Sequence, residues 1–322
     1  MPAIGRHVSK LSGYAPALPT PFDAGGNIDS AAFEAFCDLQ IEMGATALVV
    51  CGTTGEAPTL RPAEHAALIR VAVRVARGRV PVIAGAGSNS TAHAIELTKD
   101  AEAAGADAIL SVVPYYNKPM QSGLDAHFRA VAQSTGLPII LYDVPSRTGR
   151  GLADETVARL CEVPNIIGIK DATGDVSRPM RLKPFVGADF RQLSGDDATA
   201  LAYITQGGHG CISVTANLAP GLCRHMFLAC RQGQIANAQR FAAPVMRLTA
   251  ALFAETSPAP LKYALSLRGL MSPSVRLPLV ELSEQARHEL AAVVAELNER
   301  YAEHLVGKSF LVFNSHRQAV AG

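Results

Sequence analysis

The stretch NIIGIKDATG, residues 165–174, carries a short apolar run that ends in a charge. Isoleucines and one glycine fill positions 166–169, and Lys170 follows with Asp171 directly behind it. Continuous apolar runs of this length are typical of strands in a parallel sheet, where both faces are buried. The stretch therefore predicts a buried strand with a lysine near its carboxyl end.

Seven further runs of the same kind occur along the first two thirds of the chain, at residues 14–22, 45–52, 80–87, 106–116, 137–145, 190–197 and 208–217. Segments with the spacing of amphipathic helices lie between them. Strand and helix thus alternate eight times with a period of about 25 to 30 residues, which predicts an α/β fold, the (β/α)8 barrel. In that architecture reactive side chains gather at the carboxyl ends of the strands.

Strand signals end after residue 220, and long helical patterns replace them. We therefore expect an N-terminal segment (1–13), a barrel domain (14–230), a C-terminal helical domain (231–305) and a tail (306–322). The tail carries no motif to which a function can be given.

Composition narrows the class of protein. The 322 residues are 48% hydrophobic and 18% charged, which is typical of a compact soluble protein. The formal charge of +1 argues against nucleic acid or an anionic membrane as partner. No CxxC pair links the six cysteines, and no apolar stretch reaches the roughly 18 residues of a membrane span. We expect a cytoplasmic protein with reduced thiols and no metal site.

Lys170 is the sharpest chemical signal, because the other six lysines fall in loops, helices or the tail. Burial disfavours the charged ammonium, and a neutral amine can attack a ketone to form a Schiff base. The alternative is a structural ion pair with Asp171 or Asp196.

Other polar residues end neighbouring strands. Tyr142, in LYDVP, has a phenol that could transfer protons during Schiff-base formation, although a lone tyrosine is often only a packing residue. The GTTGE stretch (52–56) offers hydroxyls and amides that suit a carboxylate, or it is an ordinary capped turn. Arg147 can bind a carboxylate with its planar guanidinium, or it is a surface arginine.

Motifs for other chemistries are missing from the sequence. There is no HExxH zinc pattern, no GxSxG nucleophile turn and no GxGxxG after a strand. Carbonyl chemistry without a cofactor is the class that remains.

Six ordered motifs resemble the dihydrodipicolinate synthase family of pyruvate-dependent lyases: GTTGE (52–56), PYYN (114–117), YDVPSRTG (142–149), GIKDATG (168–174), LSGDDA (193–198) and GGHGCISVTAN (207–217). The resemblance implies a (β/α)8 barrel with a C-terminal helical domain, assembled as a homotetramer. It implies condensation of pyruvate with L-aspartate 4-semialdehyde to 4-hydroxy-tetrahydrodipicolinate, on the diaminopimelate route to lysine. No cofactor is implied beyond the covalent imine of pyruvate with Lys170.

The resemblance also implies a role for each matching residue. Lys170 would form the Schiff base, and Tyr142 would donate and accept protons. Thr53 and Tyr116 would complete a proton relay, with Tyr116 reaching into the site of the neighbouring subunit.

The substrate-binding residues follow in the same way. Thr54 would bind the pyruvate carboxylate, and Ile212 and Gly195 would lie beside pyruvate. Arg147 would bind the carboxylate of the semialdehyde.

Two other functions remain open from the sequence. One is a related 2-keto acid aldolase or dehydratase acting on a sugar acid, and the other is a non-catalytic small-acid binding paralogue. The VPSRTG arginine and the GTTGE threonines favour the synthase. Lys170, Tyr142 and Thr53 together disfavour the binding paralogue.

The chain also departs from the family pattern. Asp143 and Asp171 stand where Asn and Glu are frequent. In the region that binds lysine in feedback-inhibited members, Ala57, Pro58 and Pro62 replace more polar residues and His93 replaces a glutamate. Losing that carboxylate predicts weak or absent inhibition by lysine.

Overall fold

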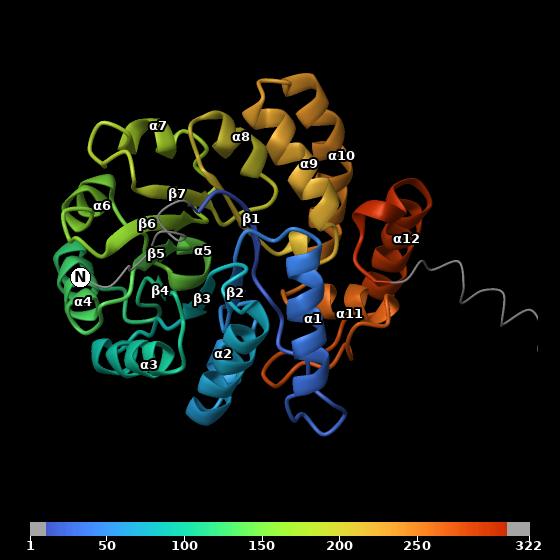
Figure 1. Ribbon diagram of the computed structural model, residues 1–322, viewed down its shortest axis with the longest axis horizontal. Helices are drawn as coiled ribbons and strands as arrows, with labels where there is room; N and C mark the ends of the chain where they lie inside the picture. The colour runs from blue at the N-terminus through green and yellow to red at the C-terminus, as the bar shows by residue number, and fades with distance from the viewer. Residues whose placement is uncertain (1–10, 308–322) are drawn as a thin grey trace, which may run out of the picture.

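Eight parallel strands curve into a barrel in the computed structural model of the protein, which describes residues 11–307 (Figure 1). The strands are β1 (Gly13–Pro16), β2 (Leu48–Val50), β3 (Val82–Gly85), β4 (Ala108–Val112), β5 (Ile139–Asp143), β6 (Ile166–Asp171), β7 (Arg191–Ser194) and β8 (Gly210–Ser213). Hydrogen bonding follows the order β1-β8-β7-β6-β5-β4-β3-β2. A parallel bridge between Ala17 and Val49 brings β1 back to β2. The predicted (β/α)8 barrel is confirmed.

Helices cover the outside of the barrel and continue beyond it. They are α1 (Ser30–Glu42), η2 (Ala57–Thr59), α2 (Pro62–Ala76), α3 (Thr91–Ala103), α4 (Gln121–Gln133), α5 (Pro145–Thr148), α6 (Asp154–Leu160), α7 (Arg178–Leu182), α8 (Ala200–Thr205), η3 (Thr215–Asn217), α9 (Pro220–Arg231), α10 (Ile235–Leu252), α11 (Ala259–Leu267), α12 (Glu284–Tyr301) and η4 (Ala302–His304). The last three α-helices pack on one another at one side of the barrel (Figure 1). Within residues 11–307, no helix combines the length and the apolar character that crossing a membrane requires.

The boundaries expected at residues 13, 230 and 305 stay predictions. Of the two terminal segments, residues 1–10 and 308–322 lie outside the described part of the chain.

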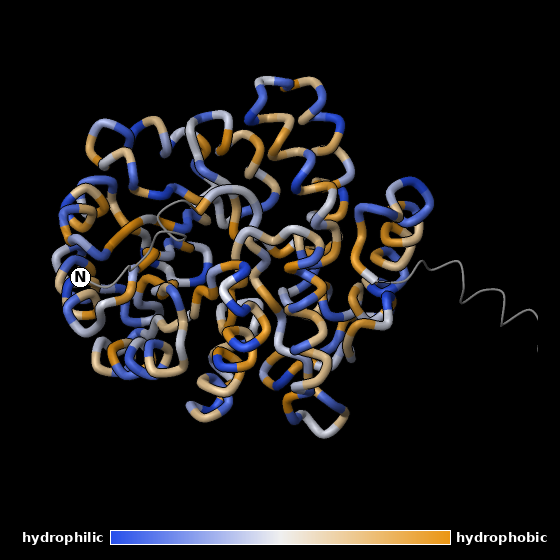
Figure 2. Tube along the Cα trace, in the orientation of Figure 1, coloured by the Kyte–Doolittle hydropathy of each residue, from blue (hydrophilic) through white to orange (hydrophobic). Residues whose placement is uncertain are grey.

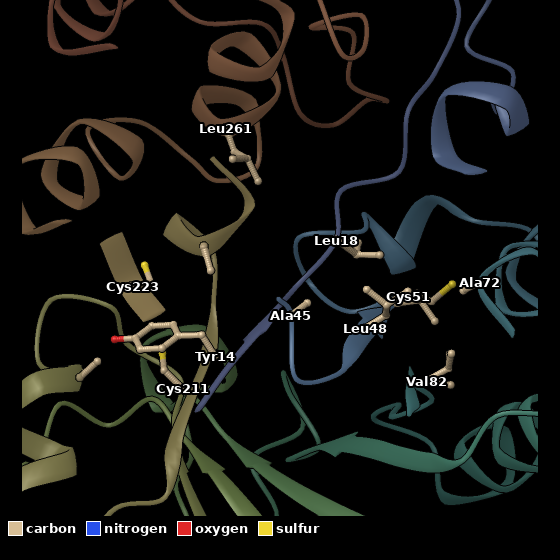
Figure 3. Packing of buried hydrophobic residues seen from close by; sticks show 14 of the residues in the cluster. Tyr14, Leu18, Ala45, Leu48, Cys51, Ala72, Val82, Cys211, Cys223 and Leu261 are labelled. Carbon is tan, nitrogen blue, oxygen red and sulfur yellow. The ribbon is translucent and has the colours of Figure 1, made fainter. Parts of the chain in front are cut away.

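The buried apolar residues form two clusters, one inside the barrel and one between the strands and the helices. Figure 2 shows hydrophobic residues along the strands and a mixture of hydrophobic and hydrophilic residues within the turns of the helices. The inner cluster is built largely from small or branched residues, such as Ala15, Val49 and Ile140. In the outer cluster, Leu261 of α11 is buried together with Leu18 and Cys51 (Figure 3). The C-terminal helices therefore share the outer cluster with the strands and helices of the barrel.

The register of β5 against β6 decides what lies at the carboxyl end of the barrel. Tyr142 is paired with Lys170, and Asp143 is paired with Asp171. Successive side chains of a strand point to opposite faces. The tyrosine and the lysine therefore lie on one face, and the two aspartates lie together on the other.

Arg178, at the start of α7, joins the two aspartates. Its guanidinium is 2.8 Å from the Asp143 carboxylate and 3.5 Å from that of Asp171. It also donates to the Leu152 carbonyl at 2.6 Å and to Asp154 at 2.9 Å. Burial raises the pKa of Asp143, and the attraction of Arg178 opposes that shift. One buried cation thus fixes the strand ends that carry Tyr142 and Lys170.

Replacing this arginine by methionine (Arg178→Met) should destabilise the fold strongly. Two buried carboxylates would lose their cation, a change that costs about 3 to 5 kcal/mol. Urea unfolding measures the loss. Arg181→Met is the matched control, because Arg181 also contacts Asp154 but its side chain is 46% exposed, so its loss should cost at most about 1 kcal/mol. Equal losses for both variants would show that Arg178 does not join the strand ends.

Candidate active site

Lys170 lies at the carboxyl end of β6 and is only 6% exposed. Within residues 11–307 its amine takes part in no hydrogen bond or ion pair, and Nζ lies 4.1 Å from the centre of the Tyr142 ring. Asp171 instead accepts from the amide and the hydroxyl of Thr173. Asp196 accepts from the Thr199 hydroxyl. The alternative of a structural ion pair for Lys170 is therefore wrong.

Gly195, just after β7, has no side chain and so leaves room for the side chain of Lys170. A Cβ at this position would lie 2.9 Å from Cε of Lys170 and 3.0 Å from its Cγ. Any larger residue would have to displace the lysine or its own loop. Ile212 of β8 is 1% exposed and belongs to the inner cluster together with Tyr142. Gly195 therefore lies against the Lys170 side chain just after β7, and Ile212 lies in the barrel interior on β8.

A cavity of about 490 Å³ opens at the same end of the barrel. Thr53, Tyr115, Tyr142 and Arg147 line it together. Arg147 lies in α5 and is exposed, and its guanidinium contacts no carboxylate within residues 11–307. The cavity therefore combines a phenol, a hydroxyl and a free guanidinium, which suits a substrate that carries a carboxylate.

The turn that carries Thr53 and Thr54 is tightly enclosed. Cys51 and Glu56, at its two ends, have φ angles of 54° and 56°, in the left-handed region. A non-glycine residue in that region costs about 1 to 2 kcal/mol. A Cβ on Gly85 of β3 would lie 2.3 Å from the Cys51 carbonyl oxygen, so only glycine allows this approach. Thr54 is 5% exposed and does not line the cavity, whereas Thr53 does.

Tyr116 is the one predicted catalytic residue that the fold does not bring to the others. Its side chain is 89% exposed and does not line the cavity, whereas the preceding Tyr115 does. Its φ angle of 74° is again left-handed. The expected role of Tyr116 in a neighbouring subunit stays a prediction.

Two buried cations near the site have no strong signal in the sequence. Arg178 has no local signature, because its partner Asp143 is 35 residues away. Lys262 lies in a segment that the sequence predicts to be an ordinary helix, yet it is 0% exposed. Its surroundings in PAPLKYAL are apolar, and that pattern was the available signal for burial.

Together these contacts give an amine with no ion pair in the described part of the chain, a phenol against it and a guanidinium on the adjoining cavity. An amine in such a place can attack a carbonyl carbon, and the phenol can move the protons that the attack requires. The geometry is therefore suited to Schiff-base chemistry on a small oxo acid.

Comparison with known proteins agrees with this geometry. A profile of the Dihydrodipicolinate synthetase family matches residues 10–297. The 4-hydroxy-tetrahydrodipicolinate synthase of Rhodospirillum centenum is 51% identical over 87% of this chain and 96% of its own length. That of Hyphomonas neptunium is 52% identical over 89% of this chain and 99% of its own length.

A solved structure extends the likeness to three dimensions. The chloride-inhibited dihydrodipicolinate synthase of Acinetobacter baumannii, in complex with pyruvate, is 44% identical and superposes with a TM-score of 0.85. The match covers 88% of this chain and 97% of the other. The resemblance first seen in six short motifs thus extends over the barrel and most of the C-terminal helices, and the chain belongs to the dihydrodipicolinate synthase family.

Proposed function

We propose that this protein is a 4-hydroxy-tetrahydrodipicolinate synthase, which condenses pyruvate with L-aspartate 4-semialdehyde. The observation that carries the proposal is the amine of Lys170, which is buried, has no ion pair among residues 11–307 and lies 4.1 Å from the ring centre of Tyr142. The names of relatives about 50% identical over most of the chain support the same activity.

The reaction begins when the Lys170 amine attacks the ketone carbon of pyruvate. The carbinolamine gains a proton on oxygen and loses water, which leaves an iminium ion. This ion makes the methyl protons acidic, and loss of one gives an enamine that attacks the aldehyde carbon of the semialdehyde. The amino group of the semialdehyde then attacks the iminium carbon, closes the ring and releases Lys170. One water leaves and no electrons are transferred, so the scheme requires no cofactor beyond the imine.

Each predicted residue has a place in this scheme. Tyr142, next to the amine, would carry protons to and from the carbinolamine, with Thr53 as the next member of the relay. Thr54 would bind the pyruvate carboxylate. Arg147, at the cavity wall, would bind the carboxylate of the semialdehyde.

Gly195 and Ile212 would shape the pocket for pyruvate beside the lysine. The room that Gly195 leaves at Cε and Cγ of Lys170 supports this assignment. The inner-barrel position of Ile212 supports an apolar contact with the substrate.

We further propose that the protein works in the cytoplasm. All six cysteines are free thiols, as expected in a reducing compartment. The proposed substrates are small molecules, and the formal charge of +1 supports neither nucleic acid nor a membrane surface as a partner.

Weak inhibition by lysine also stays a prediction, to be measured by titrating lysine into the assay. Ala57, Pro58 and Pro62 line the cavity beside His93. An alanine and two prolines offer no side-chain acceptor to the amino groups of lysine, which supports the prediction.

The Schiff base can be trapped directly. Borohydride reduction with pyruvate should add one pyruvate-derived group to the protein at Lys170, as read by mass spectrometry. Lys170→Ala should give no adduct, whereas Lys183→Ala, which removes an exposed lysine, should behave like the wild type. Tyr142→Phe should form the adduct at least about 100-fold more slowly, since it loses the proton carrier. An adduct on Lys170→Ala would refute the assignment.

Arg147→Ala should weaken the binding of the aldehyde substrate more than the binding of pyruvate. Loss of a charge-assisted hydrogen bond should raise the KM of the semialdehyde by about 10- to 100-fold and that of pyruvate by less than about threefold. Arg150→Ala is the control, because Arg150 does not line the cavity. Steady-state kinetics over a panel of aldehydes completes the test. Faster turnover of a sugar-derived aldehyde would favour the aldolase or dehydratase alternative.

We also propose the homotetramer that the family resemblance implies, in which Tyr116 acts in the site of a neighbouring subunit. Sedimentation should give a mass near four times the 33.8 kDa of one chain. Tyr116→Ala and Lys170→Ala should each be nearly inactive alone, but refolding them together should restore activity. A mixed oligomer would contain sites with Lys170 from one variant and Tyr116 from the other. Mixed oligomers without activity would place Tyr116 outside the reaction, and a monomer would refute the assembly.

A further inference from the structure

A second buried lysine lies outside the barrel, on the C-terminal helix α11. Nζ of Lys262 donates to the Glu56 carboxylate at 2.8 Å, and both side chains are 0% exposed. Among the lysines of residues 11–307, only Lys170 and Lys262 are buried. Burial lowers the pKa of Lys262, and the attraction of Glu56 opposes that shift. The pair joins residues 206 positions apart in the sequence.

Arg276 strengthens the same connection from the segment after α11. Its backbone amide donates to the other oxygen of Glu56 at 2.9 Å. Its guanidinium donates to the Thr59 carbonyl at 2.9 Å and to both oxygens of Glu64 at 2.7 and 2.8 Å. The hydrogen bonds from Arg276 lower the pKa of Glu64 to about 2. The C-terminal extension thus holds the chain from Glu56 to the start of α2.

Glu56 ends the turn that carries the two threonines of the site. Its amide donates to the Thr53 carbonyl at 3.1 Å, and its own backbone is left-handed. No hydrogen bond from the hydroxyl of Thr53 or Thr54 to another residue occurs within residues 11–307. The backbone of the turn therefore sets where these hydroxyls lie, and Glu56 is the end at which that backbone is fixed.

A contribution to stability alone does not account well for this pair. The cost of removing two charges from water offsets most of their attraction, so a buried ion pair adds little net stability, whereas an unpaired buried charge is strongly unfavourable. The pair instead fixes the position of the Glu56 carboxylate. One carboxylate oxygen accepts from Nζ of Lys262, and the other accepts from the Arg276 amide.

We propose that Glu56 and Lys262 are positioning residues, through which the C-terminal extension holds the 52–56 turn so that Thr53 and Thr54 meet pyruvate. The inference rests on the proposed function for the roles of the two threonines. It adds that the pyruvate end of the site depends on a helix outside the barrel.

The test compares Lys262→Met, the double variant Glu56→Gln with Lys262→Met, and a matched control, Arg268→Met. Arg268 is a buried cation at the end of α11, and it binds Asn298 and the Val306 carbonyl rather than the turn. Its loss disturbs the C-terminal helices without touching Glu56. Hydrogen exchange of the peptide covering residues 51–60 and the KM values of both substrates are measured for each variant.

For Lys262→Met we expect about tenfold faster exchange in residues 51–60 and about a tenfold higher KM for pyruvate, with the KM of the semialdehyde within about twofold. In the double variant, the exchange rate of residues 51–60 and the KM for pyruvate should lie between those of Lys262→Met and the wild type, because no unpaired carboxylate is left. Arg268→Met should lower the melting temperature and leave both readings at wild-type values.

Wild-type exchange and wild-type KM for pyruvate in folded Lys262→Met would overturn the proposal, and so would identical changes in Arg268→Met. If Lys262→Met does not fold, wild-type values in the double variant overturn it instead. Exchange is read without substrate. Failure of the wild type to use pyruvate would therefore refute the synthase assignment and leave the test of the turn in place.

Discussion

The pairing of β5 with β6 is the constraint on which the site depends. Lys170 and Tyr142 are direct partners across these strands, so the spacing of their Cα atoms is set by backbone hydrogen bonds. A shift of one residue would place Asp143 or Asp171 in the barrel and turn the amine outward. The same register that closes the sheet therefore selects which side chains can react.

Charges outside the barrel keep that register and the neighbouring turn in place. Arg178 binds the two aspartates that follow Tyr142 and Lys170, and Lys262 binds the glutamate that ends the GTTGE turn. Both cations are buried and both have carboxylate partners, whereas Lys170 has none within the described residues. The contrast is physically consistent, because a paired amine is held as a cation and is a poor nucleophile.

The sequence was most informative where the physical signal is local. All eight strands were predicted, since a strand buried on both faces leaves a continuous apolar run. Lys170, Tyr142, Thr53 and Arg147 could be singled out from the sequence because each ends or follows such a run, and the topology of a barrel brings the strand ends together. Their catalytic and binding roles stay predictions. The predicted runs were longer than the strands, because apolar residues continue into the loops that shape the cavity. Run 106–116, for example, contains the five residues of β4.

What could not be predicted depends on contacts between distant segments. Nothing near Lys262 in the chain names Glu56 as its partner, and nothing near Arg178 names Asp143. The exposure of Tyr116 likewise reflects a loop conformation that a single sequence does not specify. There is also an order in time: Glu56 is synthesised 206 residues before Lys262. A nascent chain that already contains every strand of the barrel still lacks the cation that pairs with the GTTGE turn, so this early part of the sequence cannot make its final contacts before residue 262 has been synthesised.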